Sequence, residues 1–317
     1  MAVFTVIDAA SLEVWLEGTD AGELLGFQGI AAGIENTNYF VDTRHGRWVL
    51  TLFERMQAPQ IDFCLRLMQR LADAGLPCPG PQVRRDGALQ AMLAGLPASL
   101  VRRLPGRSVE HADAIQCRAI GDALARMHLV ARDLADPLPN PRGLDWCLRT
   151  GEQLRGLLAP GQSRLLLDEL TDQQTFAASH ASAALPRGPV HADLFRDNAL
   201  FEGSALSGIF DFYFAGTDTW MFDLAVTCND WCIEASTGAF DPPRFKALLD
   251  GYRGVRVPTA AERDAWPTLL RAAALRFWIS RLADWHLPRP AHLLAPKDPG
   301  HFERILRLRR EFMTRID

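Results

Sequence analysis

The sequence predicts an α+β protein with a strand-rich N-terminal part and a larger, mainly helical C-terminal part. Three observations lead to this fold class. Short β-rich runs separated by turn residues fill much of the first hundred positions. After them, apolar residues recur at helical spacing. The chain has 317 residues, of which 48% are hydrophobic, and this is enough for two lobes with a packed core.

The charge balance and the apolar pattern exclude several classes of protein. Lys and Arg number 34 and Asp and Glu number 38, which argues against nucleic-acid binding through bulk charge. No stretch approaches 18 uninterrupted apolar residues, and the N-terminus lacks the basic start of a signal peptide. The six cysteines are sparse, as is typical of reduced thiols. We therefore expect a cytoplasmic protein without nucleic-acid or membrane partners, and its oligomeric state stays open.

A hairpin is predicted in the first lobe. The runs 38–42 and 47–54 are rich in β-forming residues and flank a short turn that contains Gly46. Side chains alternate along a strand, so the second run presents two faces. Trp48, Leu50 and Leu52 share one face, and Val49, Thr51 and Phe53 share the other.

Further elements of the first lobe follow from local signals. Residues 60–74 carry apolar side chains on one helical face. Residues 83–90 are predicted to form a second hairpin that turns at Asp86-Gly87. Residues 98–103 are predicted as the last strand, and the chain breaker Leu-Pro-Gly follows at 104–106.

The predicted organisation is a β-rich lobe over 1–100, a hinge over 101–106 and a mainly helical lobe over 107–317. Helical spacing in the second lobe predicts helices at 111–131 and 162–181, a broad apolar stripe from Trp266 to Trp285, which includes Trp278, and a final helix from Phe302.

The stretch 189–214 carries the most chemistry. Its short apolar runs predict strand pieces, which leave 191–198 as a loop held between strands. Phosphoryl transfer needs a carboxylate that orients the attacking hydroxyl, together with oxygen ligands for Mg²⁺. Asp193, Asn198 and Asp211 supply such a set.

Other interpretations of these residues exist. An Asp and an Asn in a loop are more often turn residues, but the ordered set with His191 and apolar flanks favours catalysis. A metal-dependent phosphoesterase built on His191 and Asp193 would need more clustered histidines. A metal site at Cys228 and Cys232 lacks a second ligand pair.

The pattern His191-x-Asp193, then Asn198, then two apolar residues and Asp211 resembles the motif of the aminoglycoside phosphotransferase and choline kinase family, which is related to protein kinases. Six segments resemble the bacterial homoserine kinases of this family: 33–41, 49–54, 104–108, 211–214, 222–225 and 229–232.

The resemblance implies a protein-kinase-like two-lobe fold that uses ATP and Mg²⁺. It makes Asp193 the catalytic base, Asn198 and Asp211 the metal ligands, and His191 a brace of the loop. Asp223 is expected to be structural too, as an N-cap or a partner of loop backbone groups. The residues that it assigns to the nucleotide are Gly33, Ile34, Glu35, Asn36, Thr37, Asn38 and Thr51, with Val101, Arg102, Arg103 and Leu104 at the adenine.

One position departs from the wider superfamily pattern. The third strand usually carries a Lys or Arg for the phosphates, and here the matching residue is Thr51, which supplies no charge. Either Arg55 or another cation substitutes, or the metal and the 33–38 turn bind the phosphates without one.

The resemblance implies phosphorylation of the L-homoserine hydroxyl to O-phospho-L-homoserine, a step toward threonine. The acceptor pocket needs a partner for the carboxylate and an acid for the ammonium; Arg196, Asp230, Tyr213 and Trp231 are the candidates. Two alternatives stay open: a kinase of another small alcohol, such as an aminoglycoside, choline or methylthioribose, and a nucleotide-binding pseudokinase.

Overall fold

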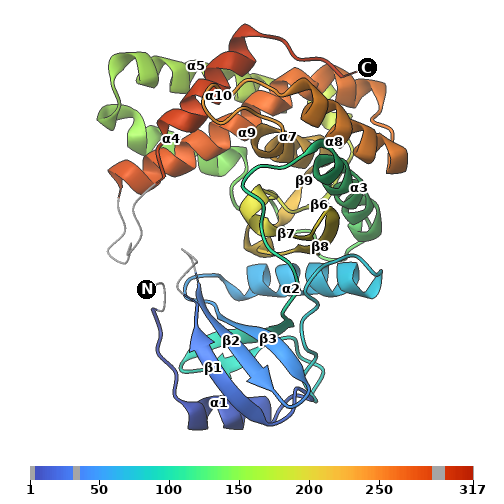
Figure 1. Ribbon diagram of the computed structural model, residues 1–317. Coiled ribbons are helices and arrows are strands. Elements are labelled where there is room, and N and C mark those ends of the chain that lie inside the picture. The colour runs from blue at the N-terminus through green and yellow to red at the C-terminus, as the bar shows by residue number, and fades with distance from the viewer. Residues whose placement is uncertain (1–3, 31–35, 288–296, 317) are drawn as a thin grey trace.

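A computed structural model describes residues 4–30, 36–287 and 297–316. The predicted α+β class is confirmed: a five-stranded antiparallel sheet comes first, and a mainly helical part follows (Figure 1). The sheet order is β1-β2-β3-β5-β4. The elements of the first part are α1 (Ala9–Leu16), β1 (Leu24–Gly29), β2 (Thr37–Thr43), β3 (Gly46–Leu52), α2 (Ala58–Asp73), β4 (Ala91–Leu93) and β5 (Leu96–Arg102).

The sheet has one face for its own core and one face for the rest of the molecule. Trp48, Leu50 and Leu52 pack with α1 in a separate small core. Val49 and Phe53 belong instead to the large core that continues into the helical part. The two faces predicted for the 47–54 run are thus confirmed. Thr51 lies on the second face, opposite Asn38 in the β2–β3 register.

Two features of this lobe differ from the sequence-based expectation. The predicted 83–90 hairpin is wrong: a local turn forms, with the Arg84 N–H bonded to the Ala88 carbonyl, but Arg84 pairs with Thr19. The hairpin forms instead between β4 and β5, where Ala94 and Gly95 adopt positive φ. The reason is that a favourable turn dipeptide does not choose the strand partner, which tertiary contacts decide. The helix α1 was not predicted.

The helical part surrounds two small β-ladders, β6 with β9 and β7 with β8. Its strands are β6 (Arg187–Val190), β7 (Ala199–Glu202), β8 (Ala205–Ile209) and β9 (Gly216–Thr219). Its helices are α3 (Ala114–Ala131), α4 (Leu144–Leu154), α5 (Pro160–Ala177), α6 (His180–Ala183), α7 (Trp220–Trp231), α8 (Pro242–Val255), α9 (Ala260–His286) and α10 (Gly300–Glu311), and its short 3₁₀ turns are η1 (Arg155–Leu157), η2 (Arg196–Asn198) and η3 (Phe212–Phe214). Within the described residues, no helix combines the length and the apolar character that a bilayer span requires.

The predicted helices are present, but two residues of their apolar stripes are not core. Ile115 is 64% exposed and Trp285 is 53% exposed, whereas Trp278 is fully buried. Both exposed residues lie in a terminal turn of their helix, α3 or α9. The helical period therefore predicts which face of each helix is buried, but not at which residue along the helix that burial ends.

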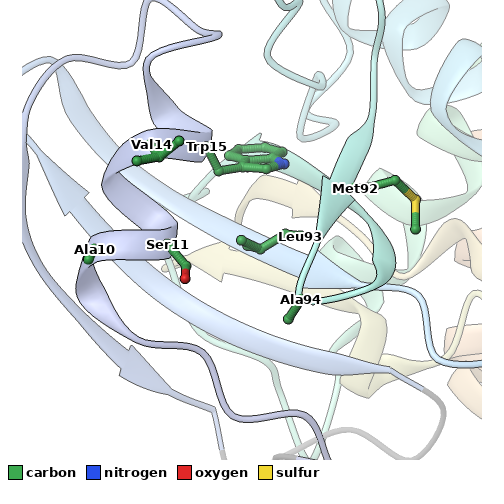
Figure 2. A pocket seen from close by; sticks show the side chains of 7 residues that line it. All are labelled: Ala10, Ser11, Val14, Trp15, Met92, Leu93 and Ala94. Carbon is green, nitrogen blue, oxygen red and sulfur yellow. The ribbon is translucent and has the colours of Figure 1, made fainter.

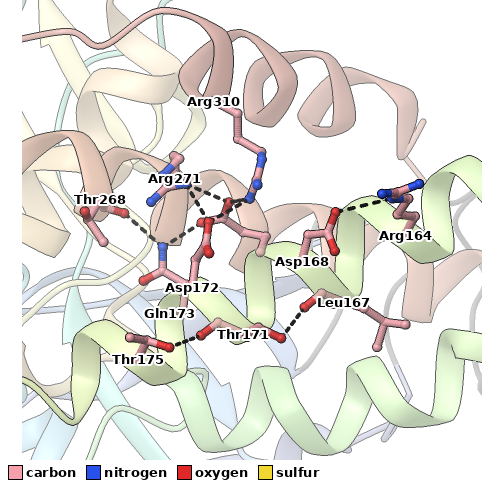
Figure 3. Close-up of polar contacts among 11 residues, drawn as sticks. Arg164, Leu167, Asp168, Thr171, Asp172, Gln173, Thr175, Thr268, Arg271 and Arg310 are labelled. Carbon is pink, nitrogen blue, oxygen red and sulfur yellow. Dashed lines mark hydrogen bonds and ion pairs between the residues drawn. The ribbon is translucent and has the colours of Figure 1, made fainter.

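A charged cluster fixes α9 against its neighbours (Figure 3). Glu169 of α5 is fully buried and pairs with both Arg271 of α9 and Arg310 of α10. Asp172 accepts from the same two guanidinium groups, at 3.0 Å and 3.1 Å. Because three helices share these contacts, the register of α9 relative to the rest of the lobe is fixed.

Candidate active site

The loop between β6 and β7 is held by buried polar contacts. Asp223, in the first turns of α7, accepts the backbone N–H groups of His191 at 2.8 Å and Ala192 at 2.7 Å. Ala192 has a φ of 62°, a conformation that needs such support in a residue with a Cβ. The His191 ring contacts the Phe210 carbonyl through Nε2 and accepts the Asp193 N–H at Nδ1, which fits a neutral imidazole protonated on Nε2.

The support of the loop continues into the helical core. His128 of α3 lies between Asp223, 3.1 Å from its Nε2, and the Tyr252 hydroxyl, 2.9 Å from its Nδ1. Arg256 donates to the Tyr252 hydroxyl. Burial holds the pKa of His128 below its ordinary value. Burial alone would raise the pKa of Asp223, but the bonds from His128 and the loop outweigh it and lower that pKa.

Asp193 lies at the end of this supported segment. Its side chain is 16% exposed. Asn198 of η2 donates from Nδ2 to the Asp193 carboxylate Oδ2 at 3.1 Å and to the Asp193 carbonyl at 2.8 Å. Burial raises the pKa of Asp193 to about 7, against the effect of the nearby Arg276, and the negative charge of Asp211 adds to the rise. A carboxylate in such surroundings is suited to accept a proton near neutral pH.

Asp211 comes two residues after β8. The Phe210 N–H donates to the Asn198 carbonyl at 3.0 Å, which ties the end of β8 to the loop. Asp211 has a left-handed backbone and immediately precedes η3. The Asn198 amide directs its nitrogen at Asp193, so its oxygen lies on the other side of the amide group. One amide oxygen and one carboxylate are ligands that fit Mg²⁺ when phosphates complete the shell. No cluster of three His, Cys, Asp or Glu residues suited to a metal occurs in the described part of the chain.

A neutral hydrogen-bond chain occupies the position of the expected basic residue. Thr51 of β3 is 1% exposed and donates to the Asn38 side-chain oxygen at 2.7 Å. The Tyr213 hydroxyl, from η3, donates to the Thr51 hydroxyl at 3.0 Å. The segment that carries Asp211 is therefore bonded directly to the N-terminal sheet. Arg55, the substitute considered from sequence, is exposed.

The other predicted nucleotide residues divide into three groups. Gly33, Ile34 and Glu35 lie outside the described residues. Asn36 and Thr37 are buried, and Thr37 donates to Glu54 at 2.6 Å.

Residues 101–104 form the third group. The backbone N–H groups of Arg102 and Arg103 donate to the carbonyls of Gly80 and Arg47. Their guanidinium groups stack over Trp48 and Phe40. Val101 is paired with Val49 in the β3–β5 ladder, so adenine contacts of Val101 and Leu104 stay a prediction.

The predicted acceptor residues make contacts with one another and with the loop. Arg196 and Asp230 form an ion pair at 3.0 Å, and Asp230 also accepts the Arg196 backbone N–H. Trp231 is fully buried and donates its indole N–H to the Leu194 carbonyl at 3.0 Å. Its one polar group is therefore engaged by the loop, which makes Trp231 a support of that segment.

One residue beside Asp193 was missed in the sequence. Arg276 of α9 lies with Nη1 3.8 Å from Asp193 Oδ1, and its side chain is only 4% exposed. The sequence did contain a signal for it, because Arg276 interrupts the apolar run from Leu275 to Trp278. Arg is seldom buried without a partner, so an arginine in such a run indicates a buried charged contact.

A groove on the N-terminal lobe is separate from these residues. Figure 2 shows it between α1 and the β4–β5 turn, and its lining includes Val14, Trp15 and Met92. The helix α1 lies on the side of the sheet remote from the helical part (Figure 1). None of the predicted catalytic, nucleotide or metal residues lines this groove.

Comparisons with known proteins agree with this arrangement. Residues 26–258 match the model of the phosphotransferase enzyme family (APH). A homoserine kinase of Janthinobacterium sp. (strain Marseille) is 49% identical over 99% of this chain and 98% of its own length. A homoserine kinase of Burkholderia thailandensis is 50% identical over 98% of this chain and 96% of its own.

Solved structures share the fold at low sequence identity. The amicoumacin kinase hAmiN superposes with a TM-score of 0.70 at 16% identity, covering 96% of this chain and 93% of its own. The spectinomycin phosphotransferase APH(9)-Ia gives 0.69 at 12% identity, covering 96% and 95%. The sheet, the supported loop and the full-length likeness together lead to one conclusion: the chain belongs to the APH phosphotransferase family, and within it to the homoserine kinases.

Proposed function

We propose that this chain transfers the γ-phosphoryl group of ATP to the side-chain hydroxyl of L-homoserine, giving O-phospho-L-homoserine on the route to threonine. The observation that carries the proposal is the near-complete coverage of this chain by homoserine kinases at 49–50% identity. The buried free cysteines are consistent with a reducing cytoplasm.

In this proposal Asp193 orients the homoserine hydroxyl and accepts its proton as the phosphoryl group arrives. The support from Asp223 and His191 keeps that carboxylate in place, which matters because phosphoryl transfer depends mainly on positioning and charge stabilisation. Asn198 and Asp211 would hold Mg²⁺, which supplies positive charge to the phosphates. The 33–38 turn and the 101–104 hinge segment would hold the nucleotide.

Thr51 is consistent with a kinase rather than a pseudokinase. Its hydroxyl is engaged by Asn38 and Tyr213, so it serves to position the Asp211 segment and does not mark a lost cation. The three groups expected for transfer, Asp193, Asn198 and Asp211, are all present.

A coupled ADP-release assay with homoserine, choline and an aminoglycoside tests the acceptor. We expect turnover with homoserine at least about a hundredfold more efficient than with the others, because a site that binds both charged ends of an amino acid rejects alcohols without them. Equal turnover with choline or the aminoglycoside would replace the acceptor, and ATP binding without any turnover would favour the pseudokinase.

A further inference from the structure

Arg276, beside the Asp193 carboxylate, has a guanidinium N–H group without a hydrogen-bond acceptor in the described part of the protein. Its guanidinium is stacked on Phe277, with Cζ 3.7 Å from the ring centroid, and lies 5.2 Å from the centroid of Phe214. Among the residues that the structure describes, no acceptor lies within hydrogen-bond distance of its buried Nε. The 3.8 Å separation from Asp193 is an ion pair but is too long for a hydrogen bond.

The two oxygens of Asp193 face different groups. Oδ2 receives the Asn198 amide, on the side of the predicted metal ligands. Oδ1 faces Arg276. An acceptor hydroxyl that approaches Oδ1 would therefore bring the remainder of its molecule close to this guanidinium.

Neighbouring cations are already occupied. Arg196 donates to both oxygens of Asp230, and also to the Glu110 carbonyl at 2.6 Å. Lys297 pairs with Asp197 at 3.1 Å. Neither side chain offers the open set of donors that Arg276 does.

Burying a cation without full hydrogen bonding is costly, so an arginine in this state is suited to an anionic ligand. Burial lowers the pKa of Arg276 to about 10, which still leaves it charged near neutral pH. The planar guanidinium fits a carboxylate through two parallel hydrogen bonds. In homoserine only two carbons, Cβ and Cα, separate the carboxylate from the carbon that bears the hydroxyl, so both groups can be engaged at one place.

We infer that Arg276 binds the α-carboxylate of the acceptor and so restricts the enzyme to amino-acid alcohols. This inference rests on the proposed function and adds the residue that binds the carboxylate end of the substrate. It replaces Arg196 as the carboxylate partner and leaves the ammonium partner to other residues.

The first test is steady-state kinetics of Arg276→Gln. We expect the KM for homoserine to rise about 10- to 100-fold, as for loss of a charge-assisted pair, while the KM for ATP stays within about twofold. Arg263→Gln is the matched control. It removes the same charge from α9 about 20 Å away along the helix and should change neither KM. An unchanged KM for homoserine in Arg276→Gln overturns the inference.

A second acceptor separates carboxylate binding from an effect on Asp193 or on the phosphoryl group. The compound 3-amino-1-propanol is homoserine with its carboxylate replaced by hydrogen. The wild type should prefer homoserine strongly, and Arg276→Gln should lose most of that preference. If the variant loses efficiency equally with both acceptors, Arg276 acts on the reaction itself and the inference is wrong.

A binding measurement removes the dependence on turnover. L-α-aminobutyrate has the charged groups of homoserine and lacks the hydroxyl. By calorimetry it should bind the wild type and Arg263→Gln, and bind Arg276→Gln at least about tenfold more weakly. If Arg276→Gln does not fold, Arg276→Lys keeps the charge and loses the paired donors, and it should weaken binding less; unchanged binding there overturns the inference. Absence of homoserine-dependent ADP release in the wild type refutes the acceptor itself, whereas an active wild type with an unaffected variant refutes only the role of Arg276.

Discussion

The hydrogen-bond chain from Tyr213 through Thr51 to Asn38 can be tested by removing its hydroxyl groups one at a time. Tyr213→Phe and Thr51→Val keep nearly the same volume. The first removes the 3.0 Å bond, and the second removes both that bond and the 2.7 Å bond to Asn38. A buried neutral hydrogen bond contributes about 1 kcal/mol, and each partner left unpaired adds to the cost.

We therefore expect the free energy of unfolding to fall by about 1 kcal/mol in Tyr213→Phe and by about 2–3 kcal/mol in Thr51→Val. The double variant should cost about 1 kcal/mol less than the sum, because both single changes break the same bond. Urea unfolding measures these values. The KM for ATP should rise about threefold or more in each variant, because Tyr213 follows Asp211 by two residues and ties it to the sheet.

Tyr39→Phe is the matched control. Tyr39 also lies in the sheet, and its hydroxyl donates to the Thr5 carbonyl at 2.8 Å, on the face that packs against α1. That hydroxyl also accepts the Ile7 N–H at 3.4 Å, so its loss should lower stability by about 1–2 kcal/mol without changing the KM for ATP. Additive costs in the double variant, or an unaltered KM for ATP in Thr51→Val, would refute a positioning role for this chain.

Three further predictions address the loop. Asp193→Asn should reduce kcat about a thousandfold with little change in the urea midpoint, since the amide keeps the shape of the side chain but cannot accept the proton; retained turnover would remove Asp193 from the mechanism. Asp223→Asn should cost about 2–3 kcal/mol of stability and lower kcat at least about tenfold, because the carboxylate accepts from His128 and from two loop N–H groups and an amide cannot serve all three; a stable, active variant would contradict this. Burial lowers the pKa values of His128 and His191 in the folded chain. In the unfolded chain these histidines have a pKa of about 6.5, so below that pH the unfolded chain binds more protons than the folded one. Stability should therefore be lost as the pH falls through about 6.5. A lower urea midpoint at about pH 5.5 than at about pH 7.5 is the expected result in Asp193→Asn, which lacks the opposing contribution of the raised Asp193 pKa, and equal midpoints would count against it.

The position of the 191–198 loop could be predicted from the sequence because its signals are local. Short apolar runs define β6, β7 and β8, and the polar residues between them must lie in a loop. The strand alternation around Thr51 also follows from local pattern, since neighbouring side chains must point to opposite faces. For the same reason the turn at Asp86-Gly87 was placed correctly, although its flanking residues pair elsewhere.

Contacts between distant segments could not be predicted this way. Arg196 and Asp230 are 34 positions apart, and nothing in the sequence around either residue indicates that they form an ion pair with each other. Arg276 is 83 positions from Asp193 by residue number and reaches it because α9 is fixed in register by the charged cluster with α5 and α10.

By itself, the sequence determined the α+β layout and the position of the supported loop, and it predicted the reacting groups, because these depend on residue type and on near neighbours. Only the tertiary structure decided which charges neutralise one another and which stay available beside Asp193. The physical reason is that the energy of a buried charge depends on every group packed around it, and that environment exists only after the chain has folded.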